Sequence, residues 1–292
     1  MLAEAFGISL TRRLAASGRP DVDFRAPMGE AALTPADSVS WRVFKNPVAL
    51  FVGGIAAVLL ELAEPRVRSG VWDHSSFRDD PVRRMARTGL AAMVTVYGAR
   101  SVAERMIAGV RRMHGRVEGI TPGGSAYGAN DPELLDWVQA TASFGFLEAY
   151  CAFVKPLPQA ERDRYYAEGE AAASLYGASG APRSEEDCRA LFARMTPKLE
   201  RSDIVFEFLA IVRRAPVLPP LLRPAQGLFI RAGIEILPAD IRALLGLRDH
   251  GLAAWERLLV KSAGTAADRV PLPGPPADAC ARLGLPADYL YR

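Results

Sequence analysis

Histidine is scarce in this sequence, since the chain contains only His74, His114 and His250. A site that needs two or three imidazoles is therefore nearly excluded, whereas a single axial ligand is possible. His114 ends an apolar stripe with helical spacings of four, three and four, made of Ala103, Ile107 and Val110. This spacing predicts an imidazole that points inward at the end of a helix. The residues alone also fit a histidine at the edge of the core, held by a carbonyl group or by the helix dipole.

Arginines gather between residues 70 and 88, next to apolar helical segments. Arg84 and Thr88 are four residues apart and so share one face of a helix, with Arg87 on the adjoining face. Arginine can bind carboxylates in a bidentate manner, so the cluster suggests a ligand with anionic groups and an apolar body. The alternative is a solvated, salt-bridged first helical turn formed by Asp79, Asp80, Arg83 and Arg84.

Common catalytic motifs are missing from the chain. It has no Walker phosphate loop, no G-x-G-x-x-G fingerprint, no G-x-S-x-G elbow around Ser125 and no H-E-x-x-H. A carboxylate-bridged di-iron bundle needs Glu-x-x-His pairs. The residues three positions before the histidines are instead Val71, Arg111 and Leu247. Classical hydrolases and di-iron oxygenases are therefore excluded.

The composition indicates a protein with a large apolar core. The chain has 292 residues, 50% of them hydrophobic, and its net charge of +3 arises from 36 basic and 33 acidic residues spread along its length. No block of like charge marks a nucleic-acid partner. The three cysteines, Cys151, Cys188 and Cys280, are odd in number and far apart. They support neither a disulfide framework nor a zinc site and fit a reducing cytoplasm.

The longest uncharged apolar run covers residues 48–60 and predicts a buried helix. It is well short of the ~20 residues that a bilayer span needs, so no transmembrane segment is expected. The first residues place Glu4 before any positive charge, and no cleavage-type sequence follows a hydrophobic stretch. A secretory signal is therefore not expected either.

Helical signals dominate, and strand-like alternation is almost absent. Three Asx-Pro pairs predict helix starts, at Asn46-Pro47, Asp80-Pro81 and Asp131-Pro132. Ser101 with Glu104, and Ser184 with Asp187, predict capping boxes for helices that end near residues 114 and 199. Further helices are expected over residues 158–176, 202–214, 224–235, 238–246 and 250–262.

Glycine and proline cluster in predicted loops at residues 115–128, 176–182, 214–224 and 271–286. We therefore predict an all-α fold, with one multi-helix domain over residues 41–265 whose long helices are joined by Gly/Pro-rich loops. Residues 1–40 are expected to form an N-terminal extension or cap. Residues 266–292 are expected to form a Pro-rich tail on the surface.

Several short segments resemble the catalytic domain shared by latex-clearing rubber oxygenases and MpaB-like oxygenases. The similar segments occur in the family's order between about residues 43 and 177, close to half of the chain. They are Leu59-Leu60-Glu61-Leu62-Ala63-Glu64-Pro65, Asp73-His74-Ser75-Ser76-Phe77, Arg84 with Thr88, Met113-His114-Gly115-Arg116-Val117, Tyr127-Gly128-Ala129-Asn130-Asp131-Pro132, Trp137-Val138-Gln139-Ala140-Thr141 and Pro156-Leu157-Pro158 with Tyr165-Tyr166. The resemblance implies a helical protein with a haem b pocket between helices.

The resemblance also implies roles for individual residues. His114 matches the segment that supplies the proximal haem ligand of the family, and Arg84 and Thr88 match its arginine and threonine close to the haem. Arg87 stands where rubber oxygenases carry a lysine, so ligation by a lysine is not carried over. His74 matches the loop before the arginine helix, where a turn-forming role and a pocket role are both open.

Two family histidines are missing from this chain. Glu64 stands at one of those positions, in the Ala-His-Pro segment of the family, and Gln139 stands at the other. Either Glu61 or Glu64 could act as a base on the distal side, as a glutamate is proposed to do in rubber oxygenases.

The sequence therefore predicts a cytoplasmic haem b oxygenase that uses dioxygen to oxidise a small apolar substrate, isoprenoid or lipid-like. Haem would supply the oxidative power, and the protein would supply the axial ligand and the pocket. Apolar helices at residues 48–60 and 90–96 would form the pocket walls. The alternative is a non-catalytic helical protein that keeps the family fold and binds an apolar ligand.

Overall fold

The computed structural model describes residues 22–218 and 220–292. In this part of the chain the fold is all-α, as predicted, apart from one two-stranded hairpin. The N-terminal half contains α2 (Val39–Phe44), α3 (Pro47–Ala63), α4 (Pro65–His74), α5 (Pro81–Tyr97), α6 (Arg100–His114) and the strands β1 (Glu118–Ile120) and β2 (Ala126–Gly128).

The rest of the chain is helical in the described residues. It contains α7 (Pro132–Phe153), α8 (Gln159–Glu168), α9 (Glu170–Tyr176), α10 (Glu185–Met195), α11 (Asp203–Arg214), α12 (Gln226–Glu235), α13 (Ala239–Leu244), α14 (Ala254–Ala267) and α15 (Pro275–Arg282). Short 3₁₀ turns lie at Thr196–Lys198, Pro220–Ala225, Arg248–His250 and Tyr289–Tyr291.

The three Asx-Pro helix starts are confirmed. The Asn46 side chain accepts hydrogen bonds from the amides of Val48 and Ala49, both at 3.1 Å. Asp80 and Asp131 cap α5 and α7 in the same way. Each cap satisfies a backbone donor that the first helical turn leaves free, so the pair of residues fixes where the helix begins.

Other local predictions are wrong. The capping residue of α6 is Ala99 rather than Ser101, whose amide bonds to the Glu30 side chain. The helix predicted over residues 158–176 is split at Gly169 into α8 and α9. The predicted loop 115–128 contains the β1–β2 hairpin.

The C-terminal segment is not a tail lying on the surface. It forms α15, where Cys280 and Arg282 are buried. The Arg282 guanidinium donates to the carbonyls of Phe24 and Glu30, which ties the segment to the opposite end of the chain. The predicted N-terminal cap falls partly on residues 1–21, outside the described residues.

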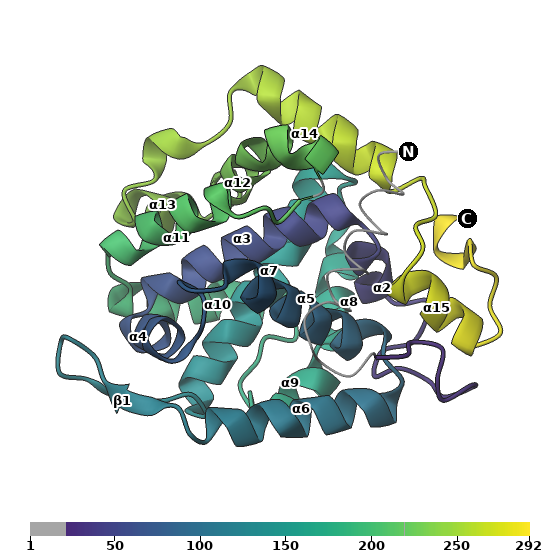
Figure 1. Cartoon of the computed structure of the whole chain (residues 1–292), viewed down its shortest axis with the longest axis horizontal. Coiled ribbons are helices and arrows are strands. Elements are labelled where there is room, and N and C mark those ends of the chain that lie inside the picture. Colours follow the sequence, from purple (N-terminus) through teal and green to yellow (C-terminus); the bar gives the residue numbers. More distant parts are fainter. Residues whose placement is uncertain (1–21, 219) are drawn as a thin grey trace.

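The core is centred on α3, which packs chiefly against α7 and α12 (Figure 1). Gly53 of α3 and Gly145 of α7 allow this close packing. A Cβ atom added at Gly53 would lie 2.7 Å from the Gly145 carbonyl oxygen, and one added at Gly145 would lie 2.5 Å from the Gly53 oxygen. The two helices therefore touch backbone to backbone.

We expect Gly53→Ala to destabilise the fold by about 1 to 3 kcal/mol, because the methyl group would push two buried backbones apart. Gly54→Ala is the matched control, since a Cβ atom there meets nothing within 4 Å. Because alanine favours helix more than glycine does, we expect the control to raise stability by about 0.5 to 1 kcal/mol. Urea unfolding of both variants measures the difference, and equal effects would contradict this account of the α3–α7 crossing.

No single helix in the described residues is long and apolar enough to cross a membrane. Only α3 and α4 together reach the required length and composition, and they are bent by 109° where they join. Most of α3 is buried inside the fold.

Candidate functional site

Three helices each bring one predicted site residue to the same region. Glu61 lies near the end of α3, Arg84 in the first half of α5 and His114 at the last position of α6. The charge of Arg84 acts on both of the others, since it opposes the rise in the pKa of Glu61 and lowers the pKa of His114. Arg84 therefore lies within electrostatic range of both the carboxyl group and the imidazole, and these three residues are called the interior cluster below.

Burial governs the protonation of the interior cluster. Loss of solvation raises the pKa of Glu61 to about 7, although the nearby Arg84 opposes this rise. Burial also lowers the pKa of Arg84, which Glu61 counteracts and Arg87 reinforces. The pKa of His114 is lowered by burial first and by Arg84 second. At neutral pH the imidazole is therefore uncharged, which is the form that can bind a metal.

One nitrogen of the His114 imidazole makes no hydrogen bond within the described residues. Its Nδ1 atom is buried and has no hydrogen-bond partner among the described residues. The predicted apolar stripe of α6 is present, because Ala103 and Ile107 are buried on the same face. A buried polar atom without a partner is costly, so this nitrogen is a candidate for a ligand that the protein alone does not supply.

Arg84 and Thr88 interact directly, as their spacing predicted. The Arg84 Nη1 atom donates to the Thr88 hydroxyl, and that hydroxyl donates to the Arg84 carbonyl oxygen at 3.1 Å. Thr88 thus holds the guanidinium along one face of α5. Of the residues in the alternative, a solvated first turn, Asp79, Asp80 and Arg83 are exposed, whereas Arg84 is partly buried and desolvated.

The two candidate glutamates are separated by the fold. Glu64 is 1% exposed and caps α4, where it accepts from the Val67 amide at 2.8 Å and from Arg66 Nε at 2.7 Å. Both of its carboxylate oxygens are therefore engaged in the structure of the helix start. Glu61, one turn earlier, belongs to the interior cluster instead.

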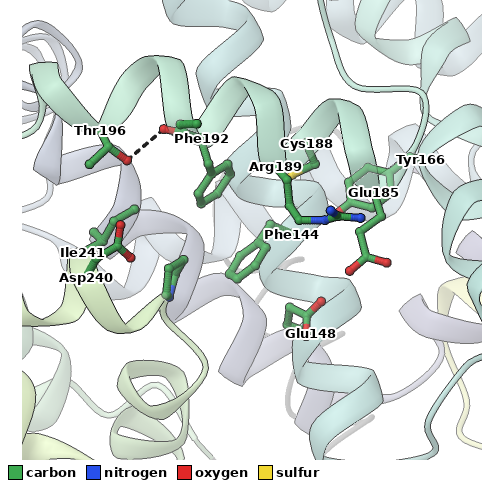
Figure 2. A pocket seen from close by; sticks show the side chains of 12 residues that line it. Phe144, Glu148, Tyr166, Glu185, Cys188, Arg189, Phe192, Thr196, Asp240 and Ile241 are labelled. Atoms are coloured by element: carbon green, nitrogen blue, oxygen red, sulfur yellow. Dashed lines mark hydrogen bonds between the residues drawn. The ribbon is translucent and has the colours of Figure 1, made fainter.

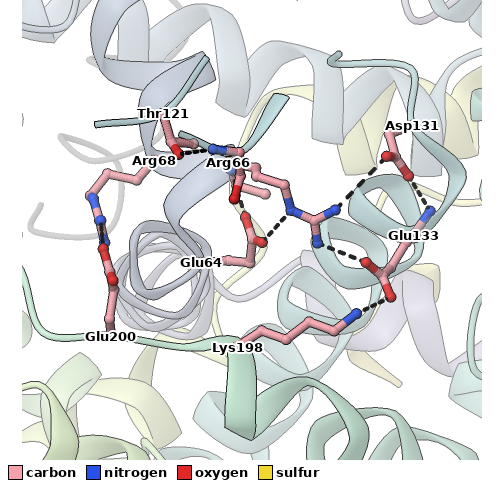
Figure 3. A network of polar contacts seen from close by, with 10 residues as sticks. Glu64, Arg66, Arg68, Thr121, Asp131, Glu133, Lys198 and Glu200 are labelled. Atoms are coloured by element: carbon pink, nitrogen blue, oxygen red, sulfur yellow. Dashed lines mark hydrogen bonds and ion pairs between the residues drawn. The ribbon is translucent and has the colours of Figure 1, made fainter. Parts of the chain in front are cut away.

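Glu64 is part of an ion-pair network that joins α4 to α7 (Figure 3). Arg66 also donates to Glu133 at 2.7 Å, and Lys198 pairs with the same carboxylate. Arg68 pairs separately with Glu200. The Glu64 carboxylate is therefore neutralised by Arg66, which also binds Glu133 of a distant segment. This gives Glu64 a structural role.

His74 is not in a loop, contrary to the prediction. It is the last residue of α4, exposed, and its Nε2 atom lies 3.1 Å from the Tyr127 hydroxyl of β2. The structure thus places His74 against the hairpin and gives it no contact with the interior cluster. Gln139, at the other missing histidine position, donates to the Ser143 hydroxyl at 3.3 Å.

A polar contact between α5 and α9, made by Thr95 and Tyr176, was not predicted from the sequence. Thr95 lies seven residues after Thr88, hence on the same face of α5, and its hydroxyl is 3.4 Å from that of Tyr176 on α9. Burial raises the pKa of Tyr176, so this hydroxyl stays protonated. The seven-residue spacing was visible in the sequence, whereas the contact with α9 required the fold.

A cavity of about 270 Å³ lies elsewhere, between α7, α10 and α13 (Figure 2). Its walls are mainly apolar, with Phe144, Phe192 and Ile241, and Glu148 and Glu185 stand at its edge. It contains no histidine and none of the predicted site residues. We therefore assign the candidate site to the interior cluster rather than to this cavity.

The pKa of Glu61 gives a pH-dependent prediction. The pKa of Glu61 rises from 4.5, its ordinary value, to about 7 in the folded protein. Above pH 4.5 the ionised carboxyl group therefore lowers the free energy of unfolding, and this cost is complete above about pH 7. The shift corresponds to at most roughly 3 kcal/mol. We expect Glu61→Gln to change stability little at pH 4.5 and to raise it by up to that amount at pH 8. Urea unfolding at both pH values tests this, and a gain that does not depend on pH would contradict the buried, titrating carboxyl group.

Comparison with known families assigns most of the chain to one family. The profile of the family described as ER-bound oxygenase mpaB/B'/Rubber oxygenase, catalytic domain, matches residues 41–268. The match covers most of the chain, and the protein belongs to this family of oxygenase catalytic domains. No curated protein and no solved structure matches the sequence.

Proposed function

We propose that this protein is a haem b-dependent oxygenase in which His114 would bind the haem iron and the substrate is apolar. The observation that carries the proposal is the half-buried, uncharged His114 imidazole, whose Nδ1 atom is buried without a partner in the described residues and whose pKa the charge of Arg84 helps to lower. Membership of an oxygenase family supports the reaction class.

The residues present fit haem better than a bare metal ion. No group of three or more His, Cys, Asp or Glu side chains in the described residues could hold a metal ion. Haem already supplies four nitrogen ligands and needs only an axial side chain, which one histidine provides. Arg84, with Arg87 close by, offers charged donors for the propionate groups.

The residues of the interior cluster are only partly covered by the rest of the fold. Glu61, Arg84 and His114 are desolvated, yet each is only partly buried. Along α3, Phe51, Gly54 and Val58 are also partly accessible on the face of Glu61, and nothing lies within 4 Å of a Cβ atom placed at Gly54.

The protein's own groups have distinct roles in this proposal. Haem, when bound, supplies the chemistry that activates dioxygen. Glu61 can accept or release a proton at its carboxyl group near neutral pH, because its pKa is about 7. The face of α3 with Phe51 and Val58 would bind the apolar substrate and exclude water from the site. Arg84, oriented by Thr88, would hold the cofactor in place.

Arg84→Ala is expected to weaken haem binding by about ten- to a hundred-fold, since a charge-assisted hydrogen bond contributes about 1.5 to 3 kcal/mol. Haem transfer to an acceptor protein measures this change. Arg83→Ala is the matched control, because Arg83 is exposed in the same helical turn. Similar transfer rates for wild type and Arg84→Ala would count against the propionate role.

Thr88→Val keeps the branched shape of the side chain and removes only the hydroxyl. Because this hydroxyl accepts from Arg84 Nη1, its loss frees the guanidinium. We expect an intact fold with faster haem loss than wild type, by a factor of about 2 to 10 for one hydrogen bond of 0.5 to 1.5 kcal/mol. Circular dichroism checks the fold, and unchanged retention would mean that Thr88 does not position Arg84.

Oxygen uptake tests the reaction class. With haem-loaded protein and a short isoprenoid alcohol, we expect dioxygen consumption and an oxygenated product, both reduced in Glu61→Gln. If the loaded protein binds the alcohol without consuming dioxygen, the non-catalytic alternative holds instead.

A further inference from the structure

The outer face of α14 is apolar, and none of the described residues covers it. Trp255, Leu258 and Leu259 are 63%, 65% and 52% exposed, at helical spacings that place them on one face. The opposite face of α14, with Val260 and Gly264, is buried against the core. The helix lies along the outer edge of the molecule (Figure 1). Large apolar side chains gathered on an exposed helix face are typical of an interaction surface.

The charges around this face are mainly positive. Lys261 is exposed on α14, Arg257 is 53% exposed although it pairs with Glu235, and Arg269 is exposed just beyond the helix end. The only acid within α14 is Glu256, which is buried and paired with Arg231. The exposed part of the helix therefore combines apolar side chains with basic ones and carries no acidic side chain.

We propose that the outer face of α14 docks this protein onto the surface of a membrane that contains anionic lipids. Tryptophan and leucine on one face and basic side chains at its edges are the features of helices that lie in the lipid interface. The apolar side chains would enter the headgroup region, and Lys261 and Arg269 would face anionic headgroups.

Charge distinguishes a lipid surface from a second copy of this chain. In a symmetric dimer, the same face of α14 would be contributed by both copies, so the basic side chains of two helices would gather in one interface. The helix exposes no acid that would offset this repulsion. Anionic headgroups supply the missing negative charge. The proposal does not depend on haem binding, so it can fail or hold independently of the proposed function.

Vesicle flotation tests the proposal directly. We expect the full-length protein to float with phosphatidylcholine vesicles that contain 30% phosphatidylglycerol, and to bind pure phosphatidylcholine vesicles at least about tenfold more weakly. The double variant Leu258→Gln/Leu259→Gln should lose at least about tenfold in binding to the anionic vesicles. Leu221→Gln is the matched control, because Leu221 is also exposed, at 66%, but lies outside α14.

Tryptophan fluorescence reports on the same helix. The other tryptophans, Trp41, Trp72 and Trp137, are at most 5% exposed, so a blue shift on addition of vesicles would come from Trp255. Such a shift, absent in Trp255→Phe, is expected. The proposal would be overturned if the protein did not bind anionic vesicles or bound neutral vesicles equally well. It would also be overturned if Leu221→Gln lost as much binding as Leu258→Gln/Leu259→Gln. A dimer in sedimentation that Leu258→Gln/Leu259→Gln dissolves would overturn it too.

Discussion

Replacement of His114 by alanine is expected to abolish haem binding. The coordinate bond would be lost together with the only imidazole in the interior cluster, and no other histidine lies there, since His74 contacts Tyr127 and His250 packs against Phe206. A bond worth at least about 3 kcal/mol corresponds to at least about 100-fold in affinity. The Soret absorbance of purified His114→Ala measures the loss.

His250→Ala is the control for this experiment. His250 lies in a 3₁₀ turn, where its ring contacts Phe206 edge-on. Its removal should leave haem content unchanged. Equal haem occupancy in the two variants would rule out His114 as the ligand.

Glu64→Ala is expected to be the most destabilising of the glutamate substitutions. It removes the cap of α4 and one of the two carboxylates that lie 2.7 Å from Arg66, whose side chain is 19% exposed. Loss of a helix cap costs about 0.5 to 2 kcal/mol, and loss of a charged hydrogen bond costs about 1.5 to 3 kcal/mol. Urea unfolding measures this change.

Glu61→Gln provides the matched comparison one helical turn away. At pH 8 we expect Glu61→Gln to raise the free energy of unfolding, whereas Glu64→Ala lowers it. The Glu61 carboxyl group is desolvated, whereas both carboxylate oxygens of Glu64 accept hydrogen bonds. Destabilisation of similar size in both variants would mean that Glu61 is also a structural residue.

The sequence predicted the features that depend on neighbouring residues. The helix starts could be placed correctly because each capping side chain binds a backbone amide within three residues of its own position. The capping residues are Asn46, Asp80 and Asp131. The inward face of α6 and the contact between Arg84 and Thr88 follow from helical spacing alone.

The features that were missed depend on distant segments. Arg66 engages Glu133, 67 residues away, and this pairing gives Glu64 its structural role. His74 meets Tyr127 across 53 residues, and Arg282 reaches Phe24 across 258. No local pattern encodes these contacts, so the sequence could not separate Glu61 from Glu64 or reveal that the C-terminal segment is packed.

The visible spectrum of the purified protein, measured together with its iron content, tests the central claim most directly. A Soret band with one iron and one haem b per chain, both lost in His114→Ala and retained in His250→Ala, is the result we predict. A colourless, folded protein that takes up no haem on reconstitution would contradict the account.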